Sequence, residues 1–367
     1  MNIAFVLLTH NPDEPAGIER SVAALARGLH GLGHEAFILA ADPPTPNDGD
    51  DVLRLRSLSL PRPAVEGDLT VLLADPRPVE DEVRRTLAER RVDVVCWVDA
   101  VWGLGYLAPA PAGTTSVLMV HVPRTDEPLL RSLEHAQEVV TVSPFMVRDM
   151  AEQGVDTTGW RVVPNALLHD VTAPSPAERE EQRGHGPVRI VARAEPHKGI
   201  AELLRAVPTD LGRAVEIVLA EAGFEYWPGM QREVIAGCQA LAAGLPGVQL
   251  LAGMPWQEIP AFLAGAAVTI VSSTSPETFG NVAAEALSVG TPVVGYGLGN
   301  LPDLVGTAGR MTDLEDGPGR LWADAAGLLA DRAGYHAAST EGPRRVTGHS
   351  SAAVASAFLD VITRARG

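Results

Sequence analysis

The chain alternates short apolar runs with longer amphipathic runs along most of its length, and this alternation limits the folds open to it. Short apolar runs bounded by turn residues are typical of buried strands, and apolar residues three or four positions apart are typical of helices. Val22, Leu25, Ala26 and Leu29 show the helical spacing. Strands that alternate with helices form βαβ units, so the pattern predicts an α/β protein with parallel sheets. In the first half we predict strands at Asn2–Leu8, Glu35–Ala40, Leu69–Leu73, Val92–Trp97, Thr115–His121 and Glu138–Val142.

Residues 171–187 interrupt this pattern with proline, glycine and charge and show no apolar periodicity, so we interpret them as a linker. At 367 residues the chain is long enough for two domains. The sequence predicts two nucleotide-binding-type domains facing across a cleft, at residues 1–170 and 188–349, with a C-terminal helix at about 350–367 that packs back on the first. A second series of strands is predicted at Val188–Ala192, Val215–Ala220, Val248–Leu251, Val268–Ser272 and Pro292–Tyr296.

The composition narrows the classes of partner and compartment. A formal net charge of −17 argues against binding to nucleic acid or to anionic membrane surfaces. No apolar run approaches the ~20 residues that span a bilayer, and the opening MNIAFVLLTH reads as a core strand rather than a signal peptide. Cys96 and Cys238 are too few for a disulfide framework. We therefore expect a cytoplasmic protein, monomeric or homodimeric, that acts on small molecules.

Neither the histidine spacing nor a D-x-D motif leads us to predict a metal site. The ten histidines include no H-x-x-H or H-E-x-x-H ligand set. Asp48-Gly49-Asp50 spells D-x-D, but it lies in a proline-rich stretch with no strand leading into it. We read it as a solvated loop and predict no metal.

Lys198 is the only lysine among 29 basic residues. It lies in VARAEPHKG, five residues after Arg193, and both follow the predicted strand Val188–Ala192. A compact ammonium and a forked guanidinium at one strand end suit a diphosphate. The alternative is a biased codon usage with one chance surface lysine.

The segment from Val271 to Gly306, VSSTSPETFGNVAAEALSVGTPVVGYGLGNLPDLVG, carries the strongest pattern. Glu277 precedes a predicted helix that begins near Asn281, and Glu285 lies inside that helix. Gly280 lets the backbone approach a ligand, and the amides that follow point out of a helix N-terminus, where anions bind. The segment thus offers carboxylates for hydroxyl groups and amides for phosphate. A surface glutamate beside a capped helix is the alternative.

These motifs resemble those of retaining glycosyltransferases of family 4, which have the GT-B fold. Ser275 to Val305 resembles the family signature S-x-x-E-x-F-G-x-x-x-x-E-A-x-x-x-G-x-P-V-V, VARAEPHKG resembles the diphosphate motif G-R-x-x-x-x-K-G, and AGIER resembles the glycine loop G-G-x-E-R. The resemblance implies two Rossmann-like domains facing across a central cleft, a nucleotide-sugar donor as co-substrate, no metal and no other cofactor. It also implies that the anomeric configuration is retained without a covalent enzyme nucleophile.

The resemblance also implies roles for individual residues. Arg193 and Lys198 would hold the diphosphate, and Glu277 would accept hydrogen bonds from the transferred sugar. His121 would lie near the reacting carbon, although its own surroundings in sequence favour a buried structural histidine. Further donor contacts would come from Gly17, Gly253, Met254, Phe279, Gly280, Asn281, Val282 and Glu285. First-domain loops would bind the acceptor, and they contain Asp13, Glu14, Asp99, Trp102, Tyr106 and Arg124.

Several positions depart from the family pattern: Ala16, Ala192, Val122 and Ala166 replace residues that are usual there, and Asp303 stands where a glutamate is frequent. None of these changes removes a charged donor contact. The donor base (uracil, guanine or another) and the acceptor stay open, with an amino sugar or aminocyclitol favoured by the acidic surplus and a place in bacterial natural-product or glycoconjugate assembly suggested by the arginine bias. A nucleotide-sugar 2-epimerase and a non-catalytic binding module are the alternative functions.

Overall fold

The computed structural model describes residues 1–11, 16–99, 110–167 and 172–366, and the chain forms two compact units. Unit 1 consists of Met1–Pro12, Gly17–Leu168 and Ser351–Gly367. Unit 2 consists of Asp13–Ala16 and His169–Ser350. Each unit contains one parallel sheet, so the predicted α/β class with parallel sheets is confirmed.

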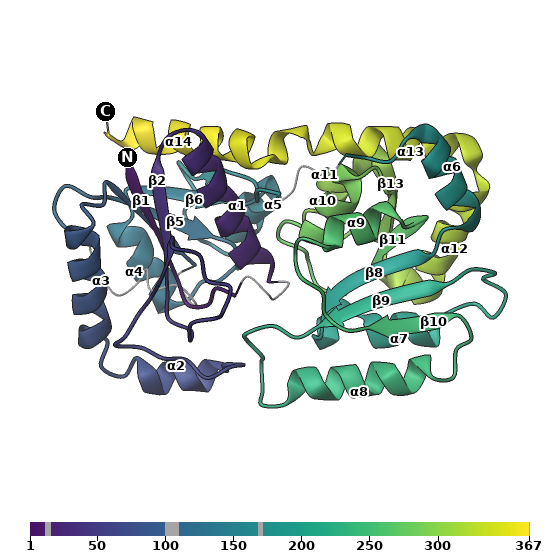
Figure 1. The fold of residues 1–367 in the computed structure, drawn as a ribbon, viewed down its shortest axis with the longest axis horizontal. Coiled ribbons are helices and arrows are strands. Elements are labelled where there is room, and N and C mark those ends of the chain that lie inside the picture. The colour runs from purple at the N-terminus through teal and green to yellow at the C-terminus, as the bar shows by residue number, and fades with distance from the viewer. Residues whose placement is uncertain (12–15, 100–109, 168–171, 367) are drawn as a thin grey trace. The chain divides into compact units, whose positions relative to one another are not determined.

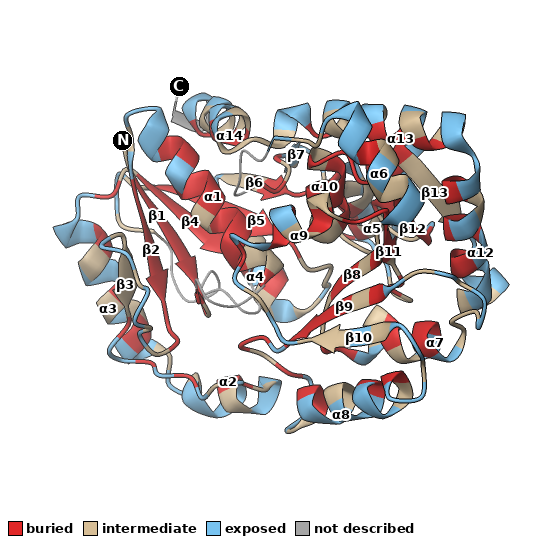
Figure 2. Ribbon diagram, turned by 45° about the vertical axis from the view of Figure 1, so that its right-hand side comes forward, coloured by how far each residue is buried: buried red, intermediate tan, exposed pale blue. Residues whose placement is uncertain are grey.

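Unit 1 is built on a seven-stranded parallel sheet in the order β3-β2-β1-β4-β5-β6-β7 (Figure 1). Its central strands are apolar on both faces because helices cover both sides of the sheet. Phe5 of β1, for example, pairs with Cys96 of β4, and Cys96 pairs with Val117 of β5; all three side chains are fully buried. Strands β1, β4 and β5 are accordingly red in Figure 2. The strands are β1 (Asn2–Leu7), β2 (Glu35–Ala40), β3 (Val52–Arg54), β4 (Val94–Val98), β5 (Thr115–Val120), β6 (Glu138–Thr141) and β7 (Arg161–Val162).

The helices of unit 1 come from both ends of the chain. The last helix, α14, packs against α1, which the yellow and purple ribbons of Figure 1 show side by side. Val354, Phe358 and Ile362 recur every four residues on the buried face of α14, and the Phe358 ring lies 6.0 Å from that of Phe5. The helices are α1 (Gly17–Gly31), α2 (Glu66–Leu72), α3 (Arg77–Glu89), α4 (Glu127–His135), α5 (Pro144–Glu152) and α14 (Ser351–Arg366).

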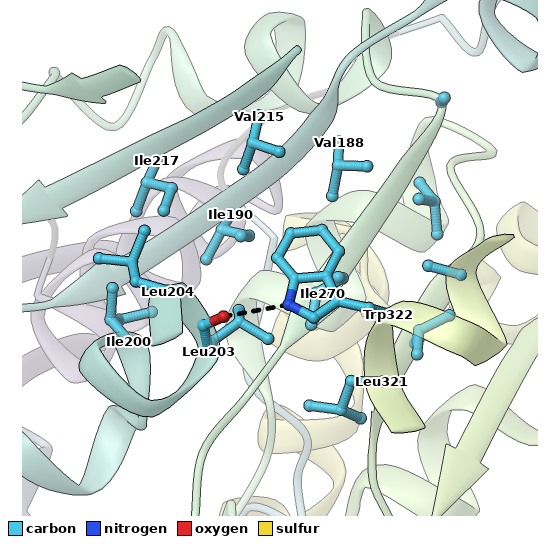
Figure 3. Packing of buried hydrophobic residues seen from close by; sticks show 14 of the residues in the cluster. Val188, Ile190, Ile200, Leu203, Leu204, Val215, Ile217, Ile270, Leu321 and Trp322 are labelled. Atoms are coloured by element: carbon cyan, nitrogen blue, oxygen red, sulfur yellow. Dashed lines mark hydrogen bonds between the residues drawn. The ribbon is translucent and has the colours of Figure 1, made fainter. Parts of the chain in front are cut away.

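Unit 2 is built on a six-stranded parallel sheet in the order β10-β9-β8-β11-β12-β13. Its core joins Val188, Ile190 and Ile217 of the sheet to Trp322 of α12, as Figure 3 shows. The Trp322 indole N–H donates to the Leu203 carbonyl at 3.0 Å, so this large side chain is buried with its polar atom satisfied. The strands are β8 (Val188–Arg193), β9 (Val215–Ala220), β10 (Val248–Leu251), β11 (Val268–Val271), β12 (Val293–Tyr296) and β13 (Gly309–Thr312).

The helices and single turns of unit 2 connect these strands and cover both faces of the sheet. The longer helices are α6 (Pro176–His185), α7 (Ile200–Arg205), α8 (Met230–Ala242), α9 (Ile259–Ala264), α10 (Asn281–Ser288), α11 (Leu301–Val305), α12 (Gly317–Ala330) and α13 (Arg332–Arg345). Four 3-10 turns add η1 (Pro196–Lys198), η2 (Gly306–Ala308), η3 (Leu314–Asp316) and η4 (Thr347–His349). No helix in the described ranges combines the length and apolarity that crossing a membrane requires.

The strand predicted at Leu69–Leu73 is wrong, because helix α2 (Glu66–Leu72) occupies that stretch. The Asp68 carboxylate accepts a hydrogen bond from the Val65 amide at 2.9 Å, which fixes the first turn of the helix. Only Leu69 of the helix is buried, whereas Val71 is 74% exposed. A short apolar run is compatible with either a strand or a helix. Here its residues are not all buried, and they pair with none of the strands described above.

The segment predicted as a linker contains helix α6 (Pro176–His185). Ser175 and Glu178 cap its start reciprocally, with the Ser175 amide donating to the Glu178 carboxylate at 2.7 Å. The one buried side chain of α6 is that of Arg179, which donates to the carbonyls of Ala264, Ala266 and Val289. The helix therefore docks through a buried guanidinium rather than an apolar stripe, and for this reason periodicity did not reveal it.

Candidate active site

The single lysine is positioned by a tight turn at the carboxyl end of β8. Arg193 is the last residue of that strand, and Lys198 ends the 3-10 turn η1. Gly199 then adopts φ +67° and starts α7, and a Cβ at this position would overlap the Ser272 carbonyl oxygen. Only glycine satisfies both the left-handed backbone and the close approach. The K-G pair of the sequence is thus a structural unit that sets where the ammonium lies.

The loop after β11 is tied to the same turn. The Ser272 hydroxyl donates to the Lys198 carbonyl at 2.8 Å, and the Thr274 amide donates to the His197 carbonyl at 2.8 Å. The Thr274 hydroxyl donates to that same carbonyl at 3.1 Å. These bonds hold residues about 75 positions apart in sequence against one another, and they bring Glu277 to Lys198.

Lys198 and Glu277 form an ion pair, with Nζ 2.7 Å from Oε1. The Ser273 hydroxyl donates to the same carboxylate oxygen. Only 16% of the Lys198 side chain and 19% of the Glu277 side chain is exposed. Because both groups are largely withdrawn from water, each depends on the other for its charge to be tolerated there.

The electrostatics of Glu277 follow from two opposing effects. Burial alone would raise the pKa of this carboxyl, but the charge of Lys198, hydrogen bonds from Lys198 and Ser273, and the charge of Arg193 outweigh it and lower the pKa. The carboxylate is therefore ionised at neutral pH. The positive charges of Arg193 and Lys198 both act on the Glu277 carboxylate, so the two cations predicted to bind the diphosphate belong to the same site.

A second carboxylate, Glu195, holds Arg193 and was not among the predicted site residues. Glu195 is 4% exposed; its Oε1 lies 3.1 Å from Nη1 of Arg193 and its Oε2 lies 3.2 Å from Nε2 of His197. Burial, followed by the charge of Lys198, lowers the pKa of His197, so this imidazole is neutral at pH 7. The alternation of Arg193, Glu195 and His197 in the sequence is the signal that would have identified the group.

Helix α10 begins at Asn281, where the sequence predicts amides that bind an anion. Gly280 is the N-cap with φ +94°, and a Cβ there would lie 2.8 Å from Leu301 Cδ2. The N-cap residue, being glycine, supplies no side-chain cap, and Asn281 and Val282 are partly exposed. The amides of the first turn and the helix dipole therefore favour an anion at this end.

Asn300 supports the loop between Glu277 and α10, and sequence reasoning missed it. Its amide donates to the Glu277 carbonyl at 2.8 Å and its side-chain Nδ2 donates to the Phe279 carbonyl at 2.9 Å. The Phe279 side chain is 3% exposed and its ring packs against His349, with 5.5 Å between the ring centroids. Phe279, which was predicted as a donor contact, therefore packs its ring inside unit 2.

The other predicted donor residues of unit 2 lie at two further places. Glu285 is on α10, two turns after Glu277, and is 5% exposed. Gly253 and Met254 follow β10, which is two strands along the sheet from β8, and Met254 is half-buried. The predicted residues thus follow the carboxyl edge of one sheet, where ligands of open α/β folds bind.

Unit 1 contains the remaining described candidates. Gly17 begins α1, and the buried Glu19 accepts from the Thr9 hydroxyl at 2.5 Å and from the Asn11 amide at 2.6 Å. The glutamate of the AGIER motif therefore ties the end of β1 to the first turn of α1. Sequence reasoning gave it no role.

His121 directly follows β5 and is 3% exposed. Its partner is Asp99, which was predicted as an acceptor contact: Oδ1 of Asp99 accepts from the His121 amide at 2.7 Å, and Oδ2 lies 3.3 Å from His121 Nδ1. Arg124 is partly exposed and pairs with Asp126, the N-cap of α4. Asp13, Glu14, Trp102 and Tyr106 lie outside the described residues.

A buried group of charges at the ends of β1 and β2 was not predicted. Arg54 pairs with Asp42 and, through Nε at 2.9 Å, with Asp48, and it donates to the His10 carbonyl at 2.7 Å. Burial raises the pKa of Asp42 to about 6 although Arg54 opposes it, and burial with the charge of Arg54 lowers the pKa of His10 to about 4. Asp48 lies outside any helix or strand, as expected of a loop, but its carboxylate is half-buried and binds Arg54 rather than being solvated.

The arrangement in unit 2 is suited to binding a polyanion next to a hydroxylated group. Two cations and the first-turn amides of α10 can neutralise phosphate oxygens, and the Glu277 carboxylate can accept hydrogen bonds from hydroxyls. Within the ranges given above, no cluster of three or more His, Cys, Asp or Glu side chains is placed to hold a metal ion.

Comparison with known proteins agrees with the motifs. Residues 15–171 match the profile of Glycosyltransferase Family 4, and residues 180–312 match that of Glycosyl transferases group 1. The chain is 30% identical over 245 residues to a 2-deoxystreptamine glucosyltransferase from Streptomyces kanamyceticus, an alignment that covers 59% of this chain and 60% of that enzyme. It is 27% identical over 342 residues to the MMP alpha-(1->4)-mannosyltransferase of Mycolicibacterium hassiacum, which covers 80% of each chain.

The fold agrees with solved structures over nearly the whole chain. A sucrose-phosphate synthase from Thermosynechococcus elongatus superposes with a TM-score of 0.79 at 20% identity, covering 99% of this chain and 98% of that one. A sequence identity this low supports a conclusion about the fold alone. The fold is GT-B, with two parallel α/β sheets. The two profiles, which together match residues 15–171 and 180–312, show that the chain belongs to glycosyltransferase family 4.

Proposed function

We propose that this protein transfers a sugar, with retention of configuration, from a nucleotide-diphosphate donor to a small-molecule acceptor, without a metal ion. The observation that carries the proposal is the group formed by Lys198, Arg193 and Glu277, with Glu277 four residues before the start of α10. Family membership and the two curated relatives, both sugar transferases by name, support the same activity.

The chemistry of the proposed reaction assigns a task to each group. Breaking the bond to the anomeric carbon leaves negative charge on the diphosphate and positive charge on the sugar. Lys198, Arg193 and the amides of Asn281 and Val282 would stabilise the departing diphosphate, which is the task a metal ion performs in other enzymes. Glu277 would accept hydrogen bonds from the sugar hydroxyls and orient the ring.

The ion pair also bears on how the site accommodates a donor. Glu277 holds the Lys198 ammonium at 2.7 Å. When a diphosphate binds, the ammonium can face phosphate oxygens while its stem stays anchored by the turn at Gly199. One preorganised cation of this kind is typically worth about 3–4 kcal/mol of transition-state stabilisation.

For the acceptor we propose an amino sugar or aminocyclitol, in natural-product or glycoconjugate assembly. Residues 1–170 contain 14 Arg and 25 Asp plus Glu, a surplus of 11 negative charges that favours a cationic or neutral acceptor over an anionic lipid. The 2-deoxystreptamine glucosyltransferase to which the chain is 30% identical is named for an aminocyclitol.

The test begins with a thermal-shift screen against UDP, GDP, ADP and TDP, because a nucleotide that binds the folded protein stabilises it by mass action. Nucleotide sugars of the stabilising base are then incubated with 2-deoxystreptamine and related amines, and the anomeric configuration of the product is read from its proton NMR coupling. Lys198→Ala and Arg193→Ala should each lower turnover by about 10²–10³-fold. Arg205→Ala, which removes an exposed cation of α7, is the matched control and should turn over normally.

The outcomes separate the alternatives. Release of an epimerised nucleotide sugar in the absence of any acceptor would identify a 2-epimerase instead. Nucleotide binding without any turnover would identify a binding module. Near-normal rates in Lys198→Ala would remove the proposed role of the lysine, and an inverted product would exclude retention.

A further inference from the structure

Asp99 holds an unusual backbone conformation at the end of β4. Its φ is +53°, and it is one of two non-glycine residues with positive φ in the described ranges. An aspartate in this region is strained relative to ordinary strand geometry, and such strain persists only where surrounding interactions over-determine it. Its amide nevertheless donates to the Met119 carbonyl at 2.9 Å, so the residue stays attached to β5.

The conformation directs the carboxylate across to the residues that follow β5. Oδ1 of Asp99 accepts from two successive amides, those of His121 at 2.7 Å and Val122 at 3.1 Å. Oδ2 lies 3.3 Å from Nδ1 of the His121 ring. One side chain therefore fixes both the backbone and the ring of the histidine, and both side chains are at most 4% exposed.

The ring of His121 is left with polar atoms to satisfy. Nδ1 and Nε2 of His121 and Oδ2 of Asp99 have no aligned hydrogen-bond partner in the described part of the chain. A buried polar atom without a partner is costly, and a proton on Nδ1 shared with Oδ2 would satisfy two of the three atoms at once. That choice of tautomer leaves Nε2 without a proton, as an acceptor. Such contacts are often long or poorly aligned until the substrate is bound.

We propose that Asp99 is a positioning residue, which holds His121 in the Nδ1–H tautomer so that Nε2 accepts a hydrogen bond from a hydroxyl of the sugar substrate. The inference rests on the proposed glycosyl transfer and replaces the acceptor contact that the sequence suggested for Asp99. Its Oδ1 already accepts two amides of its own chain and its Oδ2 faces the ring, so the carboxylate is occupied without any acceptor.

The most informative variant is Asp99→Asn. Asparagine tolerates positive φ, and its oxygen can still accept the two amides, so the fold should survive. Its NH₂ group, however, would face Nδ1 with a donor instead of an acceptor, and would reverse the tautomer. Asp93→Asn, at the opposite end of β4, where Asp93 accepts from the Asn2 amide at 2.8 Å, is the matched control.

Two measurements on the full chain test the proposal. In ¹⁵N-histidine NMR, with His121 assigned from His121→Gln, the wild type should show a protonated Nδ1 and an unprotonated Nε2. Asp99→Asn should exchange the two signals, and Asp93→Asn should not. With the donor and acceptor identified by the screen above, kcat of Asp99→Asn should fall roughly 10- to 100-fold while KM for the donor stays within about 3-fold.

Asp99→Ala adds a stability readout. It removes the amide acceptor as well as the ring partner, so it should lower Tm, which Asp99→Asn leaves near the wild-type value. An unchanged His121 tautomer in Asp99→Asn, or an unchanged kcat, would overturn the proposal. Absence of sugar transfer by the wild type would instead overturn the proposed function, and the NMR comparison would then decide the Asp99–His121 contact alone.

Discussion

Replacing Lys198 by Met should destabilise the protein through the carboxylate that it leaves behind. Met keeps most of the side-chain volume but removes the ammonium 2.7 Å from Glu277, so a largely buried charge keeps only the Ser273 hydroxyl as a side-chain partner. Removing one member of a fully buried pair typically costs 3–5 kcal/mol. Because the two side chains are 16% and 19% exposed, we expect a smaller loss of about 2–3 kcal/mol in the free energy of unfolding.

The loss should depend on pH in a defined direction. In the wild type the pKa of Glu277 lies below its ordinary value, so the pair stabilises the fold above the pKa of the unfolded carboxyl and ceases to do so as pH falls through the folded pKa. In Lys198→Met the burial of Glu277 is unopposed by the ammonium, so its pKa should rise. The difference in stability between the two proteins should therefore be largest at pH 7 and should shrink as pH falls from the raised pKa of Glu277 in the variant towards its lowered pKa in the wild type.

A double-mutant cycle with Glu277→Gln measures the pair itself. Urea unfolding of the wild type, both single variants and Lys198→Met/Glu277→Gln should give a coupling energy of about 2 kcal/mol, because the double variant contains no unpaired buried charge. The exposed pair Arg205–Glu202, whose charged atoms are 3.5 Å apart, is the control and should couple by less than about 0.5 kcal/mol. A coupling at Lys198–Glu277 as small as the control, or a deficit that grows on acidification, would refute the reasoning.

Three further predictions concern the framework. Gly199→Ala should lower stability by more than ~1 kcal/mol, since it combines a φ of +67° with overlap of the Ser272 carbonyl; an unchanged urea midpoint would contradict the turn. Arg179→Met should lower stability by about 2–4 kcal/mol by orphaning three helix-end carbonyls, and the loss should be seen in denaturant melts; a neutral result would mean that water replaces the guanidinium. Cys96 and Cys238, whose pKa values are both raised by burial, should react with a thiol reagent only after unfolding; fast labelling of the native protein would show that they are accessible.

The sequence predicted the parallel α/β class because periodicity and burial agree in strands such as Asn2–Leu7 and Val188–Arg193. Local signals picked out the turn at Gly199 and the start of α10 separately, and the family resemblance joined Lys198 and Glu277 in one site; their charged atoms lie 2.7 Å apart. Roles of those residues in catalysis stay predictions.

What the sequence missed depends on contacts between distant segments. Asn300 and Glu195 are recognisable only once the loops that they hold are folded. Asp99 was predicted as an acceptor contact, and its pairing with His121 is recognisable only once the end of β4 lies beside the residues after β5. Helix α6 docks through a single buried arginine, which no apolar pattern announces. Short strands such as β7 (Arg161–Val162) are extended only because a neighbouring strand pairs with them.

Helix α14 has a consequence for how the polypeptide acquires its structure during synthesis. Helix α14, which completes unit 1, leaves the ribosome only after all of unit 2. The apolar side chains of unit 1 that pack against Phe358 and Ile362 therefore stay exposed to solvent while unit 2 is translated. Loss of α14, by a premature stop or a protease, would expose the apolar side of unit 1 that this helix covers and should make unit 1 the first part of the chain to aggregate.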